Sequence, residues 1–452
     1  MPGTVQEFWR PIINDFNPVG RVRFEDVQRF FVDRHEEDPT RSIIQRLKVN
    51  LQNSLGQPAH YKGLLTGHVG SGKSSELLRL GQELVNDFFV VWFDAETTLA
   101  TETANHFDIL LAMGLAVHRV AAFANLDPDT HLADDFVKSF AKMIRKFEGR
   151  KGFSLKLDQV LKQVTATALG FFGVSQAVAT VTDNLLGATR LELKVGDEQV
   201  RNLELPANRE EIIGALNSII AAVREKAGKP LLIIADGLDK VPALRAKHLF
   251  SDSALLTEPA CALLYAAPIE FYHRLIAGHV TNLFNEYRIL SNPAVQKRPA
   301  TGEYWKNERE RNEHGLSVMR EVVAKRLAMQ HKTTDEILTA PALDLLALNS
   351  GGVMRELIRS IRDAATFAQL LEKTQIDETI AHKVIAQQRQ EVASRLSKPY
   401  SDTLRSILQQ GALSGGTQES IEDELLRSLY LLSYQDAIPP WFDVHPNVLP
   451  VL

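Results

Sequence analysis

The chain has 452 residues, enough for about three domains of ~150 residues each. Hydrophobic residues make up 44% and charged residues 24%, as in ordinary soluble proteins, and the formal net charge of −5 gives no overall attraction to nucleic acid or acidic membranes. The single cysteine, Cys261, excludes a disulfide framework, and the stretch MPGTVQEFWRPIINDF lacks the basic and apolar pattern of a secretory signal, so we expect a cytoplasmic protein.

The predicted elements begin with polar helices in residues 1–62, which form an N-terminal leader. An apolar strand, KGLLTG (62–67), then runs into a glycine-rich loop, and SSELLRLGQELVND (74–87) has the apolar spacing of a helix. The continuous apolar run FFVVWFDAE (88–96) predicts a strand that is buried on both faces. Another helix is expected at 108–124.

The span 126–206 interrupts this alternation and is predicted to be an insertion. Within it, residues 163–182 carry no charge and approach the length of a membrane span. Because this stretch is rich in Ala, Thr, Gly, Ser and Gln, we favour a buried or partner-facing helix, with a membrane span as the alternative.

The alternation resumes with a helix at 208–228, which Gly228 can end. Two further buried strands follow, PLLIIAD (230–236) and ALLYAA (262–267). Strands that alternate with helices predict an α/β fold built on a parallel sheet. We assign residues 63–300 to this core.

Two smaller parts are predicted after the core. Residues 301–388 are largely helical and are predicted to form a lid. Residues 395–452 begin with a helix that has Ser401 as its expected N-cap, and 420–434 changes from helix to strand. The alternating strand WFDVH (441–445) completes a two-stranded ribbon, so helices followed by this ribbon predict a winged-helix domain.

The glycine-rich loop GHVGSGKS (67–74) fits the pattern G-x-x-x-x-G-K-[ST]. Its glycines let backbone N–H groups surround a phosphate, and the following helix adds its positive N-terminal end. Lys73 is expected to reach the β- and γ-phosphates, and Ser74 to offer a hydroxyl to Mg²⁺. An ordinary glycine-rich turn is the alternative. The predicted nucleotide-binding residues of the loop are Gly67, His68, Val69, Gly70, Ser71, Gly72, Lys73, Ser74 and Ser75.

The stretch LLIIADGLDK (231–240) supplies acidic residues. Its apolar strand ends at Asp236, at the carboxyl edge of a parallel sheet, where ligands bind in such folds. Asp236 is therefore the candidate Mg²⁺ anchor, acting through water, and Asp239 is a second acid on the same loop. These two acids and Lys73 are the predicted catalytic residues.

Together the two stretches resemble P-loop ATPases of the AAA+/STAND type, a group that includes NACHT-like, KAP-like and origin-recognition-type ATPases. The resemblance implies a P-loop NTPase sheet flanked by helices, with ATP and Mg²⁺ as cofactors. These relatives often carry a glutamate that polarises the attacking water where Lys240 stands here. Asp239 could serve instead, and Asp94 and Glu96 are further alternatives, so the resemblance implies slow hydrolysis.

The strand ALLYAAPIEF departs from the same resemblance. AAA+ proteins often carry a polar residue there that orients water, and this chain offers only Tyr265, Ala266 and Ala267 before Pro268. The chain therefore offers poor candidates both for the residue that activates the attacking water and for the residue that orients it.

The lid segment NSGGVMRELIRSIRDA (349–364) resembles the start of the third lid helix in origin-recognition-type and STAND ATPases. That match implies that Arg355 contacts the γ-phosphate. We expect Arg359 and Arg362, which follow on nearly the same face, to be solvated. The stretch FVDRHEEDP (31–39) has the position of an adenine-side linker, with a surface turn as the alternative.

Arg274 and Arg288 are candidates for an arginine finger that completes a neighbouring subunit's site, as the resemblance implies. In the tail, acidic residues outnumber basic ones after Ile376. The predicted recognition helix carries three acids and one arginine, whereas a helix that binds the DNA backbone needs Lys and Arg. Its charged residues are Glu422, Asp423, Glu424 and Arg427.

We therefore expect a regulatory ATPase in which ATP·Mg²⁺ closes the lid through Arg355. Lid closure would control formation of a homo-oligomer or docking of a protein partner through the winged helix. The alternatives are an origin-recognition-like ATPase that binds DNA and a KAP-like ATPase that uses 163–182 at a membrane.

Overall fold

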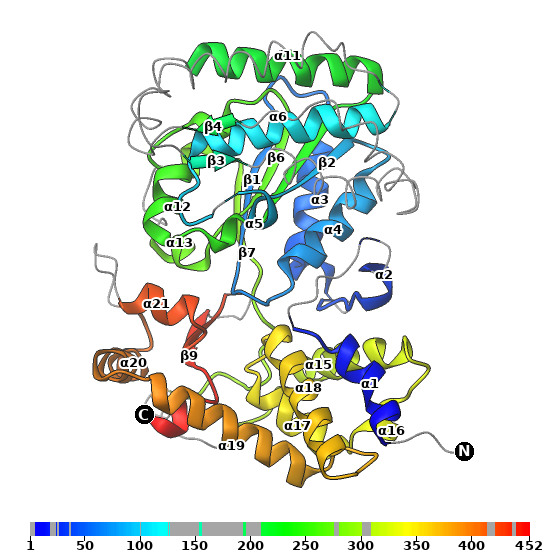
Figure 1. The fold of residues 1–452 in the computed structure, drawn as a ribbon. Coiled ribbons are helices and arrows are strands. Elements are labelled where there is room, and N and C mark those ends of the chain that lie inside the picture. The colour runs from blue at the N-terminus through cyan, green and yellow to red at the C-terminus, as the bar shows by residue number, and fades with distance from the viewer. Residues whose placement is uncertain are drawn as a thin grey trace. The chain divides into compact units, whose positions relative to one another are not determined.

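A computed structural model describes most of the chain outside the predicted insertion (Figure 1). The described residues are 5–18, 24, 27–35, 38–99, 101–124, 126, 153–155, 193–195, 209–274, 280–300, 309–413, 421–435 and 440–452. The uncharged stretch 163–182 lies outside these ranges. The chain forms two compact units. We call Ile44–Thr66 with Glu76–Arg288 the sheet unit, and Met1–Ile43 with Gly67–Ser75 and Ile289–Leu452 the helical unit.

The sheet has five strands in the order β2-β5-β6-β1-β7. Parallel pairs join β2 to β5, β5 to β6 and β6 to β1, and every residue of β1, β5 and β6 is buried. The predicted α/β fold class, a parallel sheet flanked by helices and followed by a helical part, is confirmed. The strands are β1 (Lys62–Thr66), β2 (Phe89–Asp94), β5 (Leu231–Asp236), β6 (Ala262–Ala266) and β7 (Glu286–Ile289).

Two long helices cover one face of this sheet (Figure 1). Helix α6 (His106–Phe123) begins at a capping box in which Asn105 and Asp108 each bind the other's backbone N–H, and it packs on β2. Helix α11 (Arg209–Ala227) packs on α6 and β5, and Gly228 follows it with a φ of +63°, as expected for a residue that ends a helix.

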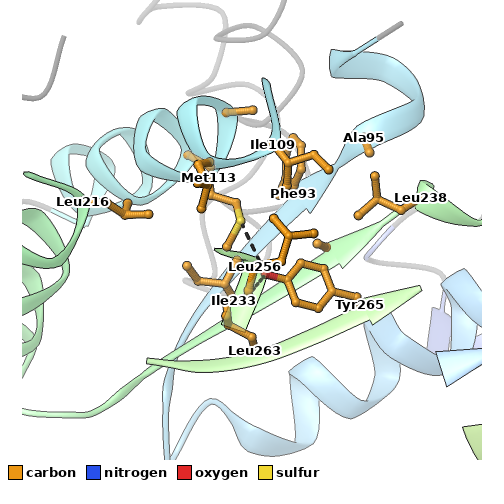
Figure 2. Close-up of a cluster of buried hydrophobic side chains, with 14 of the residues drawn as sticks. Phe93, Ala95, Ile109, Met113, Leu216, Ile233, Leu238, Leu256, Leu263 and Tyr265 are labelled. Atoms are coloured by element: carbon orange, nitrogen blue, oxygen red, sulfur yellow. Dashed lines mark hydrogen bonds between the residues drawn. The ribbon is translucent and has the colours of Figure 1, made fainter. Parts of the chain in front are cut away.

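Among the described ranges, α6 is the one helix long and apolar enough to span a membrane. Within the protein, 72% of its most apolar window is buried. Figure 2 shows Ile109 and Met113 of α6 against Phe93, Ile233 and Tyr265 of the strands, so this face of α6 lies in the apolar core of the sheet unit.

The sheet unit contains further short elements. They are α3 (Ile43–Asn53), α4 (Lys73–Leu84), α5 (Ala95–Thr98), α12 (Ala243–Phe250), α13 (Ile269–Arg274), α14 (Val280–Leu283), the 3₁₀ turns Leu238–Lys240 and Leu255–Thr257, and an antiparallel pair of β3 (Phe153–Leu155) with β4 (Leu193–Val195). The pair lies in the predicted insertion.

Helix α1 packs against α18 and shares one apolar core with α15, α17, α18 and α19 of the helical unit (Figure 1). Trp9 of α1 is fully buried there, and its ring N–H donates to the Lys373 carbonyl at 2.7 Å. Sequence patterns predict this helix as part of an N-terminal leader. A pattern of neighbouring residues does not indicate a packing partner so distant along the chain. The elements are α1 (Val5–Asp15), α2 (Val27–Phe30), the 3₁₀ turn Pro39–Arg41, α15 (Glu313–Ala328), α16 (Thr334–Ile337), α17 (Ala340–Asn349), α18 (Met354–Leu370) and α19 (Glu378–Arg395).

In its described residues, the tail of the helical unit (residues 395–452) contains two α-helices and a two-stranded antiparallel sheet. The predicted N-cap Ser401 is wrong. The first helix begins one turn earlier, with Ser397 as its N-cap, because Pro399 is well suited to the first helical turn. The elements are α20 (Lys398–Gln410), α21 (Ile421–Arg427), β8 (Leu431–Tyr434), β9 (Trp441–Val444) and the 3₁₀ turn Leu449–Val451.

Candidate nucleotide site

The predicted phosphate loop joins the end of β1 to the start of α4, so it has the expected position between a strand and a helix. Gly70 has a φ of +87° and Gly72 a φ of +93°, a backbone region that residues with a side chain rarely adopt. A Cβ on Gly70 would lie 2.6 Å from the Cβ of Arg355, and one on Gly72 would lie 2.8 Å from the guanidinium of Arg34. Both glycines are therefore needed for conformation and for space.

Lys73 is the first residue of α4, and its side chain folds back onto the loop. Its ammonium donates to the carbonyls of Gly67 and His68, at 2.7 and 2.9 Å, and the residue is only 4% exposed. A cation at a helix N-terminus, beside a loop of glycines, is suited to binding an anion. Ser74 is exposed, which leaves its hydroxyl accessible.

The other predicted loop residues differ in their surroundings. Val69 and Ser75 are half-buried. Ser71 is fully buried, and its hydroxyl has no hydrogen-bond partner within the described ranges. Its carbonyl accepts a hydrogen bond from Arg34.

Arg34 is a residue of this site that the sequence did not single out. It lies in the stretch 31–39, for which an adenine-side linker and a surface turn are the two expectations, and it is only 6% exposed. One end of its guanidinium donates to the Ser71 carbonyl, and the other donates to the Ser291 carbonyl at 2.8 Å. The same group lies 3.8 Å from the sulfur of Met354. Arg34 therefore bridges the phosphate loop and the segment that follows β7.

Arg355 lies beside the loop at the start of α18. Its backbone N–H is 3.3 Å from the Gly70 carbonyl, and its side chain is partly exposed. The predicted contact of this side chain with a γ-phosphate stays a prediction. Arg359, four residues on, is 48% exposed and pairs with Glu356 at 2.8 Å, in agreement with the expected solvated face, and Arg362 is partly exposed.

His68 has an unexpected environment for a residue of a phosphate loop. Its ring is completely buried, and both ring nitrogens contact main-chain groups of the tail. The sequence included His68 among the loop residues because of its position, and nothing in the local pattern indicated a partner in the tail.

The predicted acids lie in the sheet unit, at the carboxyl ends of neighbouring strands. Asp236 ends β5 and is 4% exposed, and its register partner across the ladder is Asp94, the last residue of β2. Asp239 and Lys240 follow in a 3₁₀ turn and are half-buried. The Asp94 carboxylate accepts the backbone N–H of Glu96 at 3.1 Å and so caps α5.

Tyr265, the one polar side chain of β6, points into the apolar core (Figure 2). Its hydroxyl donates to the Leu256 carbonyl at 2.6 Å and lies 3.9 Å from the sulfur of Met113. Burial raises the pKa of Tyr265 well above its ordinary value. Because its hydroxyl is bonded inside the core, Tyr265 is poorly placed to orient a water at the edge of the sheet.

Of the two candidate arginine fingers, Arg288 lies on β7, where its guanidinium pairs with Glu286 at 2.8 Å. Arg274 is the last residue of α13. A role in trans for either residue stays a prediction.

The sequence matches no protein-family model and no curated protein. Among solved structures, it is similar to the Aeropyrum pernix ORC1 protein in complex with DNA, with 12% identity and a TM-score of 0.37 over 90% of this chain and 89% of that one. Cdc6p from Pyrobaculum aerophilum gives 11% identity and a TM-score of 0.38 over 97% and 96%. The RuvB Holliday junction branch migration motor of Thermotoga maritima gives 13% identity and a TM-score of 0.26 over 55% and 90%. Likenesses this low carry no argument about activity, which rests on the residues of this chain.

Proposed function

We propose that the chain is an ATP-binding regulatory ATPase of the AAA+/STAND type that hydrolyses ATP slowly. Closure of its helical lid on ATP controls self-assembly or the docking of a protein partner. The observation that carries this proposal is the contact between the phosphate loop and the start of α18, where the Arg355 backbone lies on Gly70. A ligand held by the loop therefore has the lid helix as its immediate neighbour.

Each site residue has a chemical role in this proposal. The loop amides and the N-terminal end of α4 bind phosphate oxygens, and Lys73 balances the charge of the β- and γ-phosphates. Ser74 offers a hydroxyl and Asp236 a carboxylate, the hard oxygen ligands that Mg²⁺ prefers, and bound Mg²⁺ neutralises phosphate charge. Mg²⁺ at such sites takes few protein ligands, so it does not need a cluster of acids.

We attribute slow hydrolysis to the turn that follows β5. Lys240 occupies the position where a water-activating glutamate would stand, and its positive charge cannot accept a proton from water. We expect Lys240→Glu to raise the steady-state rate of phosphate release about tenfold or more. The exposed Lys247 on α12 provides the control, because Lys247→Glu makes the same charge change away from the loop. An unchanged rate in Lys240→Glu, with loss of activity in Asp239→Asn, would instead assign the acid role to Asp239.

The switch itself is tested by measuring molar mass after size-exclusion chromatography, with ADP and with a non-hydrolysable ATP analogue. We expect the analogue to change the mass or elution of the wild type, and Lys73→Ala to abolish this response because phosphate binding is lost. Lys226→Ala, at an exposed lysine of α11, is the control. A wild type that binds the analogue and keeps its mass, elution and proteolysis pattern would contradict the switch.

The tail is proposed to dock a protein rather than DNA. Glu422 and Asp423 are buried, so α21 presents chiefly Glu424 and Arg427 to solvent. A helix that binds the DNA backbone needs several exposed basic side chains, and α21 has a single arginine. Salt-dependent binding of duplex DNA at physiological ionic strength would favour the alternative function.

A further inference from the structure

Asn292 lies in the segment that follows β7, and its side chain is fully buried. Neither the oxygen nor the nitrogen of its amide has a hydrogen-bond partner among the residues that the structure describes. Buried amides are normally paired, because an unpaired one costs free energy of folding. The amide offers one acceptor and one donor group side by side, so it points to a partner outside the chain with the opposite pattern.

On one side, the segment around Asn292 borders the phosphate loop. A Cβ on Gly67 of the loop would lie 2.6 Å from the Leu290 carbonyl oxygen. The Ser291 carbonyl accepts a hydrogen bond at 2.8 Å from Arg34, which also binds the loop. Asn292 is therefore the next residue after the one that this arginine ties to the loop.

On its other side, the segment borders the turn before α18. A Cβ on Gly352 would overlap the Pro293 carbonyl oxygen and lie 3.6 Å from the Cβ of Asn292. Val353, the next residue of the turn, is fully buried, and its Cγ1 would lie 3.4 Å from a Cβ on Gly70 of the loop. The loop, the Asn292 segment and this turn are thus mutual neighbours.

A nucleotide whose phosphates are held by the loop places its base beside the loop, because the ribose separates the base from the phosphates. Adenine presents a donor, its 6-amino group, next to an acceptor, N7, and an asparagine amide matches this pair with two hydrogen bonds. Guanine presents two acceptors, O6 and N7, along the same edge, so the amide can pair with only one of them. An unpaired asparagine amide beside a phosphate loop is therefore suited to select adenine over guanine.

We propose that Asn292 selects the adenine base of ATP, donating from its amide nitrogen to N7 and accepting at its amide oxygen from the 6-amino group. This inference rests on the proposed function, since it requires ATP to bind the loop. Because the amide is fully buried, its segment and the turn before α18 must separate for the base to enter. The bound base then pairs both groups that the chain itself leaves unpaired.

Three nucleotides test the two hydrogen bonds separately in the wild type. ADP, GDP and 7-deaza-ADP avoid turnover during the measurement, and isothermal titration in the presence of Mg²⁺ gives the dissociation constants. 7-Deaza-ADP has a C–H group in place of N7 and loses the bond from the amide nitrogen, so we expect it to bind about fivefold more weakly than ADP. GDP has an oxygen in place of the amino group, and we expect it to bind about tenfold more weakly than ADP.

Asn292→Leu replaces the amide by an apolar group of similar size. The dissociation constants of the three nucleotides are expected to converge in this variant, close to that of the wild type for GDP, because no partner for N7 or the amino group remains. Asn53→Leu makes the same substitution at an exposed residue at the end of α3, and it should keep the wild-type preference. If Asn292→Leu fails to fold, the comparison of the three nucleotides in the wild type decides by itself.

The outcomes separate base selection from the proposed function. If the wild type binds ADP and 7-deaza-ADP equally well, or if Asn292→Leu keeps the wild-type preference, Asn292 does not select the base and the ATP-binding function stands. A buried water is then the partner of the amide. If the wild type binds neither ADP nor a non-hydrolysable ATP analogue, the proposed function fails and base selection fails with it.

Discussion

Gly352→Ala is expected to lower the free energy of unfolding of the helical unit by about 3 kcal/mol or more. Gly352 has a φ of +77°, and a Cβ there would overlap the carbonyl oxygen of Pro293. The obstructing atom belongs to the backbone, so no side-chain rotation can relieve the overlap. The turn before α18 and the segment after β7 would have to separate.

Two other glycines separate the effect of the steric overlap from the effect of the positive φ. Gly228→Ala places a side chain at a similar positive φ of +63°, with no atom near the added Cβ. We therefore expect it to lower the free energy of unfolding by only about 1 kcal/mol. Gly214→Ala, inside α11 and also in open space, should stabilise the chain by about 0.5–1 kcal/mol. Urea unfolding followed by tryptophan emission measures all three, with Trp9 and Trp441 reporting on the helical unit that contains Gly352, and Trp92 on the sheet unit that contains Gly214 and Gly228. Equal losses of stability in Gly352→Ala and Gly228→Ala would show that the turn before α18 can move away from Pro293 at little cost.

Arg34→Leu is expected to weaken binding of ATP·Mg²⁺ about 30- to 100-fold. The guanidinium donates to the carbonyls of Ser71 and Ser291, and each hydrogen bond from a charged group contributes about 1.5–3 kcal/mol when it is buried. Leucine removes both bonds and leaves the loop without its anchor to the segment after β7. The loop amides would then lose the arrangement that surrounds a phosphate.

Arg34→Lys separates charge from geometry. Lysine keeps the positive charge but cannot reach two carbonyls from opposite ends of a planar group, so it should restore little of the affinity. Arg29→Leu, an exposed arginine of α2, controls for the loss of one positive charge. Isothermal titration with a non-hydrolysable analogue gives the dissociation constants. Near-normal binding by Arg34→Lys would show that charge near the loop matters more than the bridge.

The parts of this fold that the sequence predicts are those with a local signature. The strands β5 and β6 are largely continuous apolar runs because both faces of a parallel sheet are covered, and the loop between β1 and α4 has fixed glycine and lysine positions. Strand β7 was missed for the opposite reason. Its buried Glu286 interrupts any apolar run, and the carboxylate is satisfied by Tyr61 at 2.8 Å and Asn50 at 2.6 Å, partners that no local window contains.

The same limit explains the site residues that sequence patterns did not identify. Arg34 donates a hydrogen bond to the carbonyl of Ser291, and the ring of His68 contacts the backbone of Leu426 and Ser433. Each of these partners is more than two hundred positions away along the chain. A pattern of neighbours along the chain indicates that a phosphate loop is present. It does not indicate which side chains of that loop contact distant elements.

The packing of α1 against α18 has a consequence for the order in which the protein can form during synthesis. The sheet unit is complete once residue 288 has been made, apart from the loop at 67–75 that belongs to the other unit. The helical unit must wait, because the core that receives Trp9 includes α18 and its ring N–H bonds Lys373. Until then the apolar face of α1 has no core to enter and is open to aggregation or to a chaperone. The phosphate loop, which packs with the same unit, acquires its contacts with α18 and the tail only at the last stage of synthesis.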